Sequence, residues 1–282
     1  MEFNTLEKLS IDQLTKLFNK AFSDYIVKIQ LTPEFLQEKI ISENIRLDKS
    51  IGAFSCGKPV GFIFHALRKI DNSWVAYNAG TGVIPEFRGN NTTVKMYENK
   101  LSELKHSGVS KILLEVIDKN TAAIKSYKKV GFKKTADLDC YKGTIETKAI
   151  KNDINFKEIN ITQCSDFFPF WDWQPTWQHS LLTLQQLPAY RVFGAYVNNE
   201  LAAYAIMSPK KGRVPQFCVK PHFRRNGIGT QLFIFLSNMH PDTENLHSFN
   251  INRKSEATSL FLKSLGMDIF LSQHQMQLTL NS

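Results

Sequence analysis

The chain has 282 residues, of which 43% are hydrophobic and 22% are charged. This composition is typical of a soluble globular protein and excludes a disordered, collagen-like or small disulfide-rich one. At about 150 residues per domain, the length indicates two domains or one large one. No apolar run approaches the roughly 20 residues of a membrane-spanning helix, and the first residues lack the apolar core of a secretory signal, so we expect a cytoplasmic protein.

Lys and Arg outnumber Asp and Glu by 35 to 26, which gives a net charge of +9. This excess favours an anionic partner, such as nucleic acid, anionic lipid or a phosphorylated cofactor. However, no tract of five or six basic residues marks a nucleic-acid-binding arm. The four cysteines are far apart, and no Cys/His cluster has metal-ligand spacing, so we expect reduced thiols and no metal site.

Three blocks of sequence recur in the same order with nearly the same spacing. The pairs are VIPEFR (83–88) and VKPHFR (219–224), YKKVGF (127–132) and LKSLGM (262–267), and GAF (52–54) and GAY (194–196). A repeat distance of about 136 residues is the size of a domain, which predicts a duplication. We expect one domain over residues 1–148 and another over 152–282, joined within the polar stretch 144–155. The alternative for that stretch is a hairpin loop of the first domain.

Hydrophobic periodicity and turn residues predict the same order of elements in both copies. The first copy contains a helix capped by Ser10 or Asp12, a helix from Thr32 to Asn44, two strands around the turn 56–59, a strand over 74–83, a helix over 91–105, a strand over 111–116, a helix over 120–129 and strands after Gly131. The second copy contains strands near 192–197, 201–208 and 213–219 and a helix over 227–238. Three consecutive antiparallel strands predict an α+β (mixed α/β) fold with a mostly antiparallel sheet flanked by helices, not a doubly wound parallel sheet.

The turn between the strand 213–219 and the following helix has the residues expected of an anion site. Residues 224–230 read RRNGIGT. A helix N-terminus presents unpaired backbone N–H groups, and Gly227 and Gly229 have no Cβ to crowd a ligand. Arg224 and Arg225 add positive charge. The pattern predicts a phosphate-binding loop, and the alternative is a turn that only starts a helix.

This loop, with the strand before it and the helix after it, resembles the GNAT superfamily of acyl-CoA-dependent N-acyltransferases. Arg224, Gly227 and Gly229 match the superfamily signature Q/R-x-x-G-x-G/A. The family block N-x-x-A-x-x-x-Y-x-x-x-G-F is matched by Asn120, Ala123, Tyr127, Gly131 and Phe132. The resemblance covers nearly the whole chain as two tandem copies. It implies two middle strands that splay to admit the pantetheine arm of an acyl-CoA, and direct transfer of the acyl group to an amine.

The two copies depart from the family pattern in different places. The first has Asn91 and Thr93 where the glycines belong, but it retains Tyr127 at the family's position for the acid that protonates the thiolate. Asn tolerates left-handed backbone conformations, so we expect the first loop to form, with side chains crowding the phosphate. The second copy keeps its loop but has Leu262 and Ser255 where the family has Tyr and Asn.

The resemblance assigns site residues in both copies. The candidate catalytic residues are Tyr127 as the acid and Glu115 as a proton relay. Their alternative roles are a packing tyrosine and a solvent-facing or lysine-paired carboxylate. The candidate acyl-CoA-binding residues of the second copy are Phe217, Cys218, Val219, Arg224, Arg225, Asn226, Gly227, Ile228, Gly229 and Thr230. Those of the first copy are Val83, Arg88, Gly89, Asn91, Thr93 and Asn120.

An aromatic stretch precedes the strands of the second copy. Its members are Phe167, Phe168, Phe170, Trp171, Trp173 and Trp177. Packing in the core or between domains is the favoured interpretation, and the lining of an acceptor pocket is the alternative. His179 and His222 have no partners at metal-ligand spacing, so we assign them no role.

The leading functional prediction is an N-acetyltransferase that uses acetyl-CoA and a small-molecule or peptide amine, with no metal and no membrane partner. The alternative is a non-catalytic acyl-CoA-binding or scaffold protein, because the loop and the acid are divided between the copies. A nucleic-acid-binding module is a third alternative, but only the +9 charge favours it and the sequence contains no recognition motif. The acceptor and the oligomeric state cannot be read from the sequence.

Overall fold

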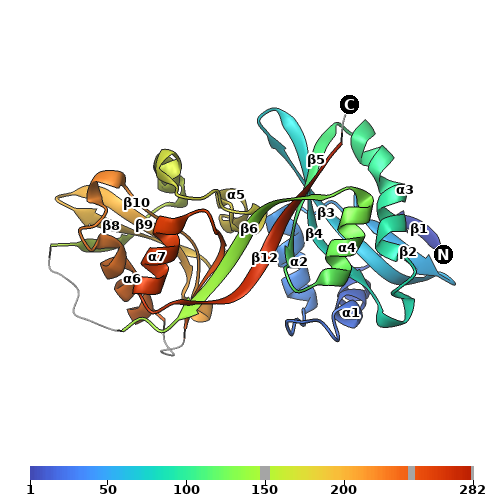
Figure 1. Ribbon diagram of the computed structural model, residues 1–282, viewed down its shortest axis with the longest axis horizontal. Helices are drawn as coiled ribbons and strands as arrows, with labels where there is room; N and C mark the ends of the chain where they lie inside the picture. Colours follow the sequence, from blue (N-terminus) through green and yellow to red (C-terminus); the bar gives the residue numbers. More distant parts are fainter. Residues whose placement is uncertain (147–152, 241–244, 281–282) are drawn as a thin grey trace. The chain divides into compact units, whose positions relative to one another are not determined.

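The computed structural model describes residues 1–146, 153–240 and 245–280 (Figure 1). The chain forms two compact units. The first consists of Met1–Ala136 and His274–Ser282, and the second consists of Asp137–Gln273. Within the described residues no helix is long and apolar enough to cross a membrane.

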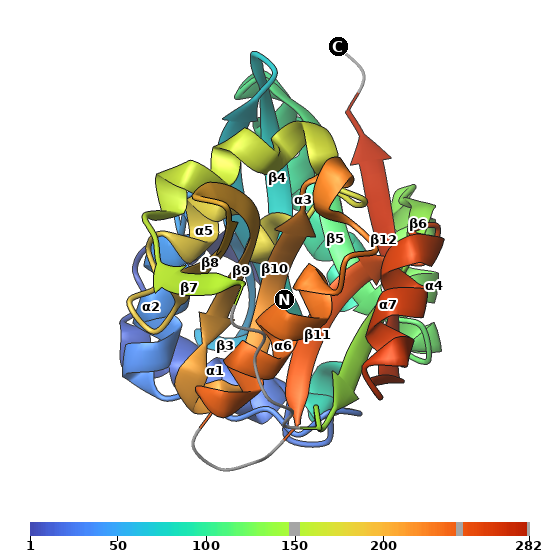
Figure 2. The ribbon, with the colours of Figure 1, turned by 90° about the vertical axis from the view of Figure 1, so that its left-hand side faces the viewer.

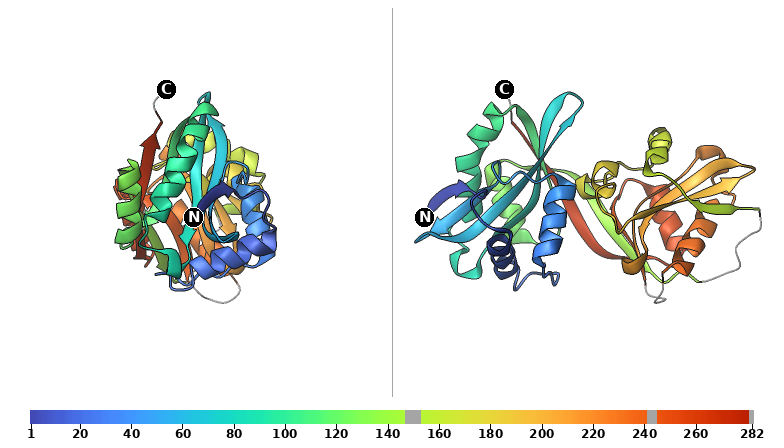
Figure 3. Two further views of the ribbon diagram at one scale, coloured as in Figure 1. Left: turned by 90° about the vertical axis from the view of Figure 1, so that its right-hand side faces the viewer. Right: turned by 180° about the vertical axis from the view of Figure 1, so that it is seen from behind.

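The first unit has a mixed sheet with the strand order β1-β2-β3-β4-β5-β12. Its elements are β1 (Glu2–Thr5), α1 (Ile11–Ala21), α2 (Pro33–Glu43), β2 (Ile51–Ser55), β3 (Lys58–Ile70), β4 (Ser73–Val83), the 3₁₀ turn η1 (Pro85–Phe87), α3 (Thr92–His106), β5 (Val109–Ile117), α4 (Thr121–Val130) and parts of β6 (Lys133–Gly143) and β12 (Asp268–Thr279). Strands β1 to β4 are antiparallel neighbours, whereas β4 and β5 are parallel. Figure 3 shows α1 and α3 of this unit beside its sheet.

The second unit repeats this plan with the strand order β6-β11-β10-β9-β8-β7. Its elements after β6 are β7 (Asn155–Glu158), η2 (Ile161–Phe170), η3 (Trp177–His179), α5 (Leu181–Leu184), β8 (Arg191–Val197), β9 (Glu200–Ser208), η4 (Pro209–Lys211), β10 (Arg213–Val219), η5 (Pro221–Phe223), α6 (Ile228–Asn238), β11 (Leu246–Asn252) and α7 (Glu256–Ser264). Strands β7 to β10 are antiparallel neighbours, and β10 and β11 are parallel. The mixed α/β fold predicted from the sequence is confirmed in both units.

Local sequence explains where the first helices begin. Ser10 caps α1 in a capping box with Gln13, and Thr32 caps α2 with Pro33 at its first position. Helix α1 then buries an apolar stripe that includes Leu14. The described part of the second unit has no such pair of helices between β7 and β8. Two 3₁₀ turns and the short α5 lie between β7 and β8, and η2 contains Pro169, which cannot donate a helical hydrogen bond.

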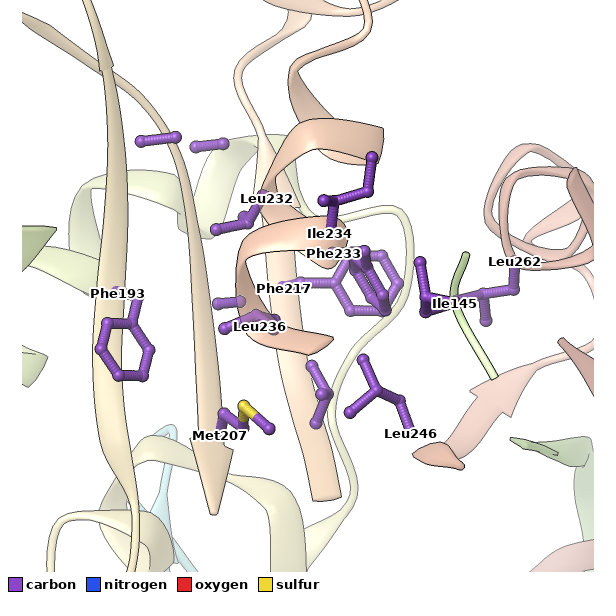
Figure 4. Packing of buried hydrophobic residues seen from close by; sticks show 14 of the residues in the cluster. Ile145, Phe193, Met207, Phe217, Leu232, Phe233, Ile234, Leu236, Leu246 and Leu262 are labelled. Atoms are coloured by element: carbon purple, nitrogen blue, oxygen red, sulfur yellow. The ribbon is translucent and has the colours of Figure 1, made fainter. Parts of the chain in front are cut away.

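The core of the second unit lies between α6 and the sheet. Phe217 of β10 and Phe233 of α6 stack edge to face with ring centroids 4.9 Å apart. Leu232, Leu236 and Leu262 are fully or almost fully buried in the same cluster (Figure 4). Full burial of a leucine or phenylalanine side chain contributes about 1.5–3 kcal/mol. This cluster therefore fixes the position of α6 on β10, and with it the loop between them.

The compact units divide the chain inside two strands. Residues 133–136 of β6 belong to the first unit and 137–143 to the second, whereas β12 contributes 268–273 to the second and 274–279 to the first. In the second unit, residues 138–143 of β6 pair with β11. In the first, Leu280 donates its N–H to Ser110 of β5. The expected boundary of the duplication, between residues 148 and 152, lies outside the described residues and stays a prediction.

Candidate active site

In each unit the two parallel middle strands stop pairing before they end. Strands β4 and β5 pair only as far as Tyr77 and Leu113, although they continue to Val83 and Ile117. Strands β10 and β11 pair only at Arg213 and its partner His247. Strands β10 and β11 can be followed side by side in Figure 2. We call the region between the unpaired ends the interstrand gap, which corresponds to the splay that the GNAT resemblance implies.

The loops that follow β4 and β10 have the same backbone form. The φ angles are −72° at Arg88, +79° at Gly89 and +55° at Asn91, and −67° at Arg224, +64° at Arg225 and +79° at Gly227. The left-handed conformation of Asn91 confirms that the first loop forms without the glycine of the signature. Turns that contain left-handed residues can point successive N–H groups toward one side, which is a form that binds anions.

Both loops lead into helices whose N-cap side chain makes no capping hydrogen bond. Asn91 caps α3 and Gly227 caps α6 without such a bond. In contrast, Asn120 accepts a hydrogen bond from the N–H of Ala123 in α4. The first N–H groups of α3 and α6 are therefore not taken by their own caps, and the positive end of the helix dipole faces the loop. A helix N-terminus of this kind suits a phosphate group.

The side chain of Arg88 holds the first loop in the form that the two loops share. Its Nε donates to the carbonyl of Val83 at 3.0 Å, and its Nη1 and Nη2 donate to the two carboxylate oxygens of Asp24, each at 2.7 Å. Nη2 also donates to the carbonyl of Ala21 at 2.9 Å. The guanidinium holds the end of β4 against the segment after α1, and this is a structural role that its place in the signature did not reveal.

Arg224 makes the corresponding contacts in the second unit, with one hydrogen bond to the carboxylate instead of two. Its Nε donates to the carbonyl of Val219 at 2.9 Å, its Nη1 donates to Asp172 at 3.0 Å, and its Nη2 donates to the carbonyl of Phe170 at 2.7 Å. Arg225 is exposed. Its charge is better placed than that of Arg224 to meet a ligand at the loop.

The other predicted binding residues of the second unit fall into two groups. Asn226 and Gly227 are exposed, whereas the side chains of Phe217, Cys218 and Ile228 are buried. The buried residues can offer a ligand only their main chain. Thr230 is half-buried in the first turn of α6.

Gly229 has a packing role that its place in the signature did not predict. A Cβ at this position would lie 3.1 Å from the ring of Phe261 and 3.5 Å from Val219. A glycine here lets α6 approach α7 closely. The first unit has Thr93 at this position, half-buried in α3.

Asn91 adds a side chain to the first loop where the second has none. Its Oδ1 accepts a hydrogen bond from Nζ of Lys129 at 3.1 Å. Lys129 belongs to α4, so this contact brings a cation from a second helix to the loop. The second unit has Ser264 at the equivalent position of α7 and therefore lacks this charge.

Tyr127 lies in α4, buried against β4. Burial raises the pKa of its hydroxyl to about 12, although hydrogen bonds with Thr81 and Asn78 act in the opposite direction. Asn78 also donates to the hydroxyl of Tyr97 at 2.8 Å. The hydroxyl of Tyr127 thus lies among polar groups beyond the point where β4 leaves β5, and it stays protonated at neutral pH.

Glu115 lies in β5, is half-buried, and has both carboxylate oxygens in hydrogen bonds with other side chains. Its Oε2 accepts a hydrogen bond from the hydroxyl of Tyr77 at 2.7 Å, and its Oε1 accepts one from Nε2 of Gln275 at 3.4 Å. Burial raises the pKa of this carboxyl above its usual value. Tyr77 and Asn78 are successive residues of β4 and point to opposite faces. Glu115 and Tyr127 therefore approach the gap from opposite faces of the sheet.

The helix caps give an exact correspondence between the two units. Asn120 before α4 has φ −82° and ψ 69°, and Ser255 before α7 has φ −82° and ψ 67°. Seven residues after the caps stand Tyr127 and the buried Leu262, and five residues before them stand Glu115 and Asn250. The second unit has neither the hydroxyl nor the carboxylate. The role of Asn250 was not predicted, because its strand has no sequence motif.

The aromatic stretch packs mainly inside the second unit. Phe167, Trp173 and Trp177 are buried, whereas Phe168 is 49% exposed. We assign no chemistry to His179 or His222. Burial lowers the pKa of His179 to about 4. His222 is exposed, and its Nε2 lies 3.3 Å from Oε1 of Glu200. Among the described residues, no group of His, Cys, Asp or Glu could hold a metal ion.

The Acetyltransferase (GNAT) family profile matches residues 11–132, and a second profile, Acetyltransferase (GNAT) domain, matches residues 175–266. The chain belongs to the GNAT family. Together the two matches cover most of this GNAT chain, one in each repeat. No curated protein matches it.

Solved structures share the tandem architecture. A GCN5-related N-acetyltransferase from Sphaerobacter thermophilus has a TM-score of 0.74 at 11% identity, over 100% of this chain and 96% of that one. A tandem GNAT protein from the clavulanic acid biosynthesis pathway has a TM-score of 0.74 at 12% identity, over 100% and 99%. A putative acetyltransferase from Pyrococcus horikoshii has a TM-score of 0.63 at 14% identity, over 99% and 88%. At these identities the likeness shows the fold alone.

Proposed function

We propose that this GNAT protein transfers an acyl group, most simply acetyl, from an acyl-CoA to an amine. The observation that carries the proposal is the arrangement of Tyr127 and Glu115 on opposite faces of the sheet at the gap between β4 and β5. The adjoining loop, with uncapped N–H groups and Lys129, suits the pyrophosphate of the acyl-CoA.

The transfer makes three chemical demands. An alkyl ammonium has a pKa near 10, so a base must remove a proton before the amine can attack. The thioester oxygen gains negative charge as the amine adds and needs hydrogen-bond donors. The departing thiolate needs a proton. In balance, a C–N bond forms, the C–S bond breaks and one proton moves from nitrogen to the base while another reaches sulfur.

The first unit has a group for each demand. Glu115 is the base, because a carboxyl whose pKa is raised accepts a proton more readily than an exposed one. Main-chain N–H groups of β4 beyond Tyr77 are free of β5 and can donate to the oxyanion. Tyr127 protonates the thiolate, since its pKa of about 12 keeps its proton available at neutral pH. Exchange with solvent then restores both side chains.

The experiment is an acyl-transfer assay of the full chain with acetyl-CoA and a panel of small amines and peptides, followed by mass spectrometry of the product. Tyr127→Phe and Glu115→Gln should each lower kcat by about 10²- to 10⁴-fold. Tyr97→Phe is the matched control, because it removes a neighbouring buried hydroxyl that also contacts Asn78. Equal losses in all three variants, or no acylated product with any amine, would count against the proposal.

A further inference from the structure

We infer that the second unit does not transfer an acyl group, because residues 170–179 of its own chain fill its interstrand gap. We call these residues the plug. The inference deepens the proposed function by confining the chemistry to the first unit. It rests on that function for the identity of the ligand, but not for the occupancy of the gap.

The plug is fastened across the open end of the gap. Arg224, which follows β10, donates to the carboxylate of Asp172 at 3.0 Å. Ser255, which follows β11, donates its hydroxyl to the carbonyl of the same Asp172 at 2.7 Å. One residue of the plug thus joins the ends of both diverging strands.

Deeper in the gap, side chains of both strands bind the plug. Asn250 of β11 donates to the hydroxyl of Thr176 at 3.2 Å. Gln216 of β10 donates its amide to the carbonyl of His179. Asn250 has φ +57°, a left-handed conformation that is rare for a strand residue, and its Oδ1 accepts from Cys140 of β6 at 3.5 Å. The polar groups that a pantetheine arm would need are already engaged.

Aromatic side chains fill the remaining space. The ring of Trp173 lies 5.1 Å from that of Phe217, and it is buried in the same cluster as Ile251 and Leu262. Trp171 donates to the hydroxyl of Tyr204 at 2.9 Å. The pocket beside these rings leaves no enclosed room even for a water molecule. Sites that enclose a small ligand usually measure about 300–1,000 Å³.

The first unit provides an internal comparison. Asp24 meets Arg88 as Asp172 meets Arg224, and Tyr25 follows Asp24 as Trp173 follows Asp172. The next residue is exposed in both units, Ile26 in the first and Gln174 in the second. Four residues after the aspartate the two chains differ, because Lys28 is exposed whereas Thr176 is buried. The fastening is therefore shared, whereas the buried continuation through Thr176 and Trp177 is a feature of the second unit.

The residues that replace Tyr127 and Glu115 in the second unit also argue against acyl transfer there. The second unit has Leu262 where the first has Tyr127, and Asn250 where it has Glu115. An amide cannot act as the base, and leucine has no proton to donate. The exposed loop at 225–227 remains able to bind the nucleotide end of a CoA molecule, without transfer.

Tryptophan fluorescence tests the plug directly. The chain has four tryptophans, and three of them lie in the plug. In a Trp74→Phe variant every tryptophan signal comes from the plug, and Trp74 lies outside the proposed machinery. Acrylamide quenching should be low and should be the same with and without saturating acetyl-CoA. Adenosine 3′,5′-bisphosphate, which lacks the pantetheine arm, is the control ligand. A rise in quenching produced by acetyl-CoA but not by the nucleotide would show that the arm displaces the plug, and would overturn the inference.

Turnover tests the confinement of chemistry. The double variant Glu115→Gln/Tyr127→Phe should retain no more than about 1% of the parental kcat. Turnover near the parental value would place the reaction in the second unit and overturn the inference. If the parental protein acylates no amine and calorimetry detects no acetyl-CoA binding, the proposed function fails, whereas low quenching without any ligand still supports the burial of the plug.

Discussion

Asp24 accepts hydrogen bonds from both terminal nitrogens of Arg88, each at 2.7 Å, and so ties the segment after α1 to the end of β4. The pair lies at the start of the first loop and is repeated by Asp172 and Arg224 in the second unit. A bidentate carboxylate pair fixes the orientation of the guanidinium as well as its position. The loop is therefore positioned by a contact made before any ligand arrives.

Replacing this carboxylate should weaken acyl-CoA binding by the first unit. In Asp24→Asn the second charged hydrogen bond is lost, so the loop should sample other conformations and the Kd measured by calorimetry should rise several-fold. Arg88 lowers the pKa of Asp24. The contact is thus fully formed above the unfolded-state pKa near 4 and is lost as the pH falls through the lower folded-state pKa. Glu86→Gln is the control, because it removes an exposed ion pair with Lys20 nearby; an equal effect in both variants would refute the role of Asp24.

Tyr127→Phe should separate catalysis from binding. The variant keeps the ring that packs at 5.7 Å from Phe132, so its fold and its affinity for acyl-CoA should be unchanged. Loss of the acid should lower kcat by about 10²- to 10⁴-fold. Because the pKa of Tyr127 is about 12, its ionisation should produce no fall in the parental rate between pH 6 and about pH 9. Parental turnover in the variant would leave the hydroxyl with a structural role only.

Asn91→Gly should tighten the binding of acyl-CoA to the first unit. Glycine adopts the observed φ of +55° without strain, and removal of the side chain frees Lys129 to approach the phosphate. The reciprocal change Gly227→Ala should cost about 1 kcal/mol of stability, because its φ of +79° disfavours a Cβ. Calorimetry and urea unfolding measure the two effects. Weaker binding by Asn91→Gly would show that the asparagine itself contacts the ligand.

His65 should make the stability of the protein depend on pH. It is fully buried with its Nδ1 3.0 Å from the carbonyl of Lys49, and burial lowers its pKa from 6.5 to about 4. Between these values the unfolded chain binds the proton first. The free energy of unfolding should therefore fall as the pH drops from 6.5 towards 4, by up to about 1.4 kcal/mol per pH unit. Urea unfolding at pH 7 and pH 5 should show this loss, and His65→Gln should show a smaller one.

Residues 274–280 should be required for a stable first unit. Met276 and Leu278 are buried, and a Cβ at Gly131 would lie 3.3 Å from Leu278. A chain that ends at residue 273 loses these contacts, and large apolar truncations cost about 2–5 kcal/mol per site. Amide hydrogen exchange should therefore accelerate in β5 more than in β9. Unchanged protection of β5 would contradict the assignment of this segment to the first unit.

The sequence predicted those features that depend on neighbouring residues. The range 213–219 agrees with β10, the caps at Ser10 and Thr32 are confirmed, and the left-handed Asn91 follows from its side chain. These signals are local, because capping and turn conformation involve residues within a few positions of each other.

What the sequence did not reveal depends on partners distant in the chain. Arg224 was predicted as a phosphate-side charge, and its contact with Asp172 comes from a segment 52 residues earlier. The plug was not predicted either, because residues 161–184 fold as short turns without the periodicity of α1 and α2. Hydrophobic periodicity could not predict the division of β6 and β12 between the units either, because the pattern of a strand does not depend on the sheet that it joins.

The division of β12 sets an order of events during synthesis. A ribosome makes the whole second unit before it reaches residues 274–279, yet these residues belong to the first unit. Until then, the nascent first unit presents β5 as an open sheet edge, and such edges readily pair with other chains. Slow elongation or termination before residue 274 would prolong that exposure. Errors in the codons for residues 274–279 should thus appear as aggregation of a part of the protein that was made earlier.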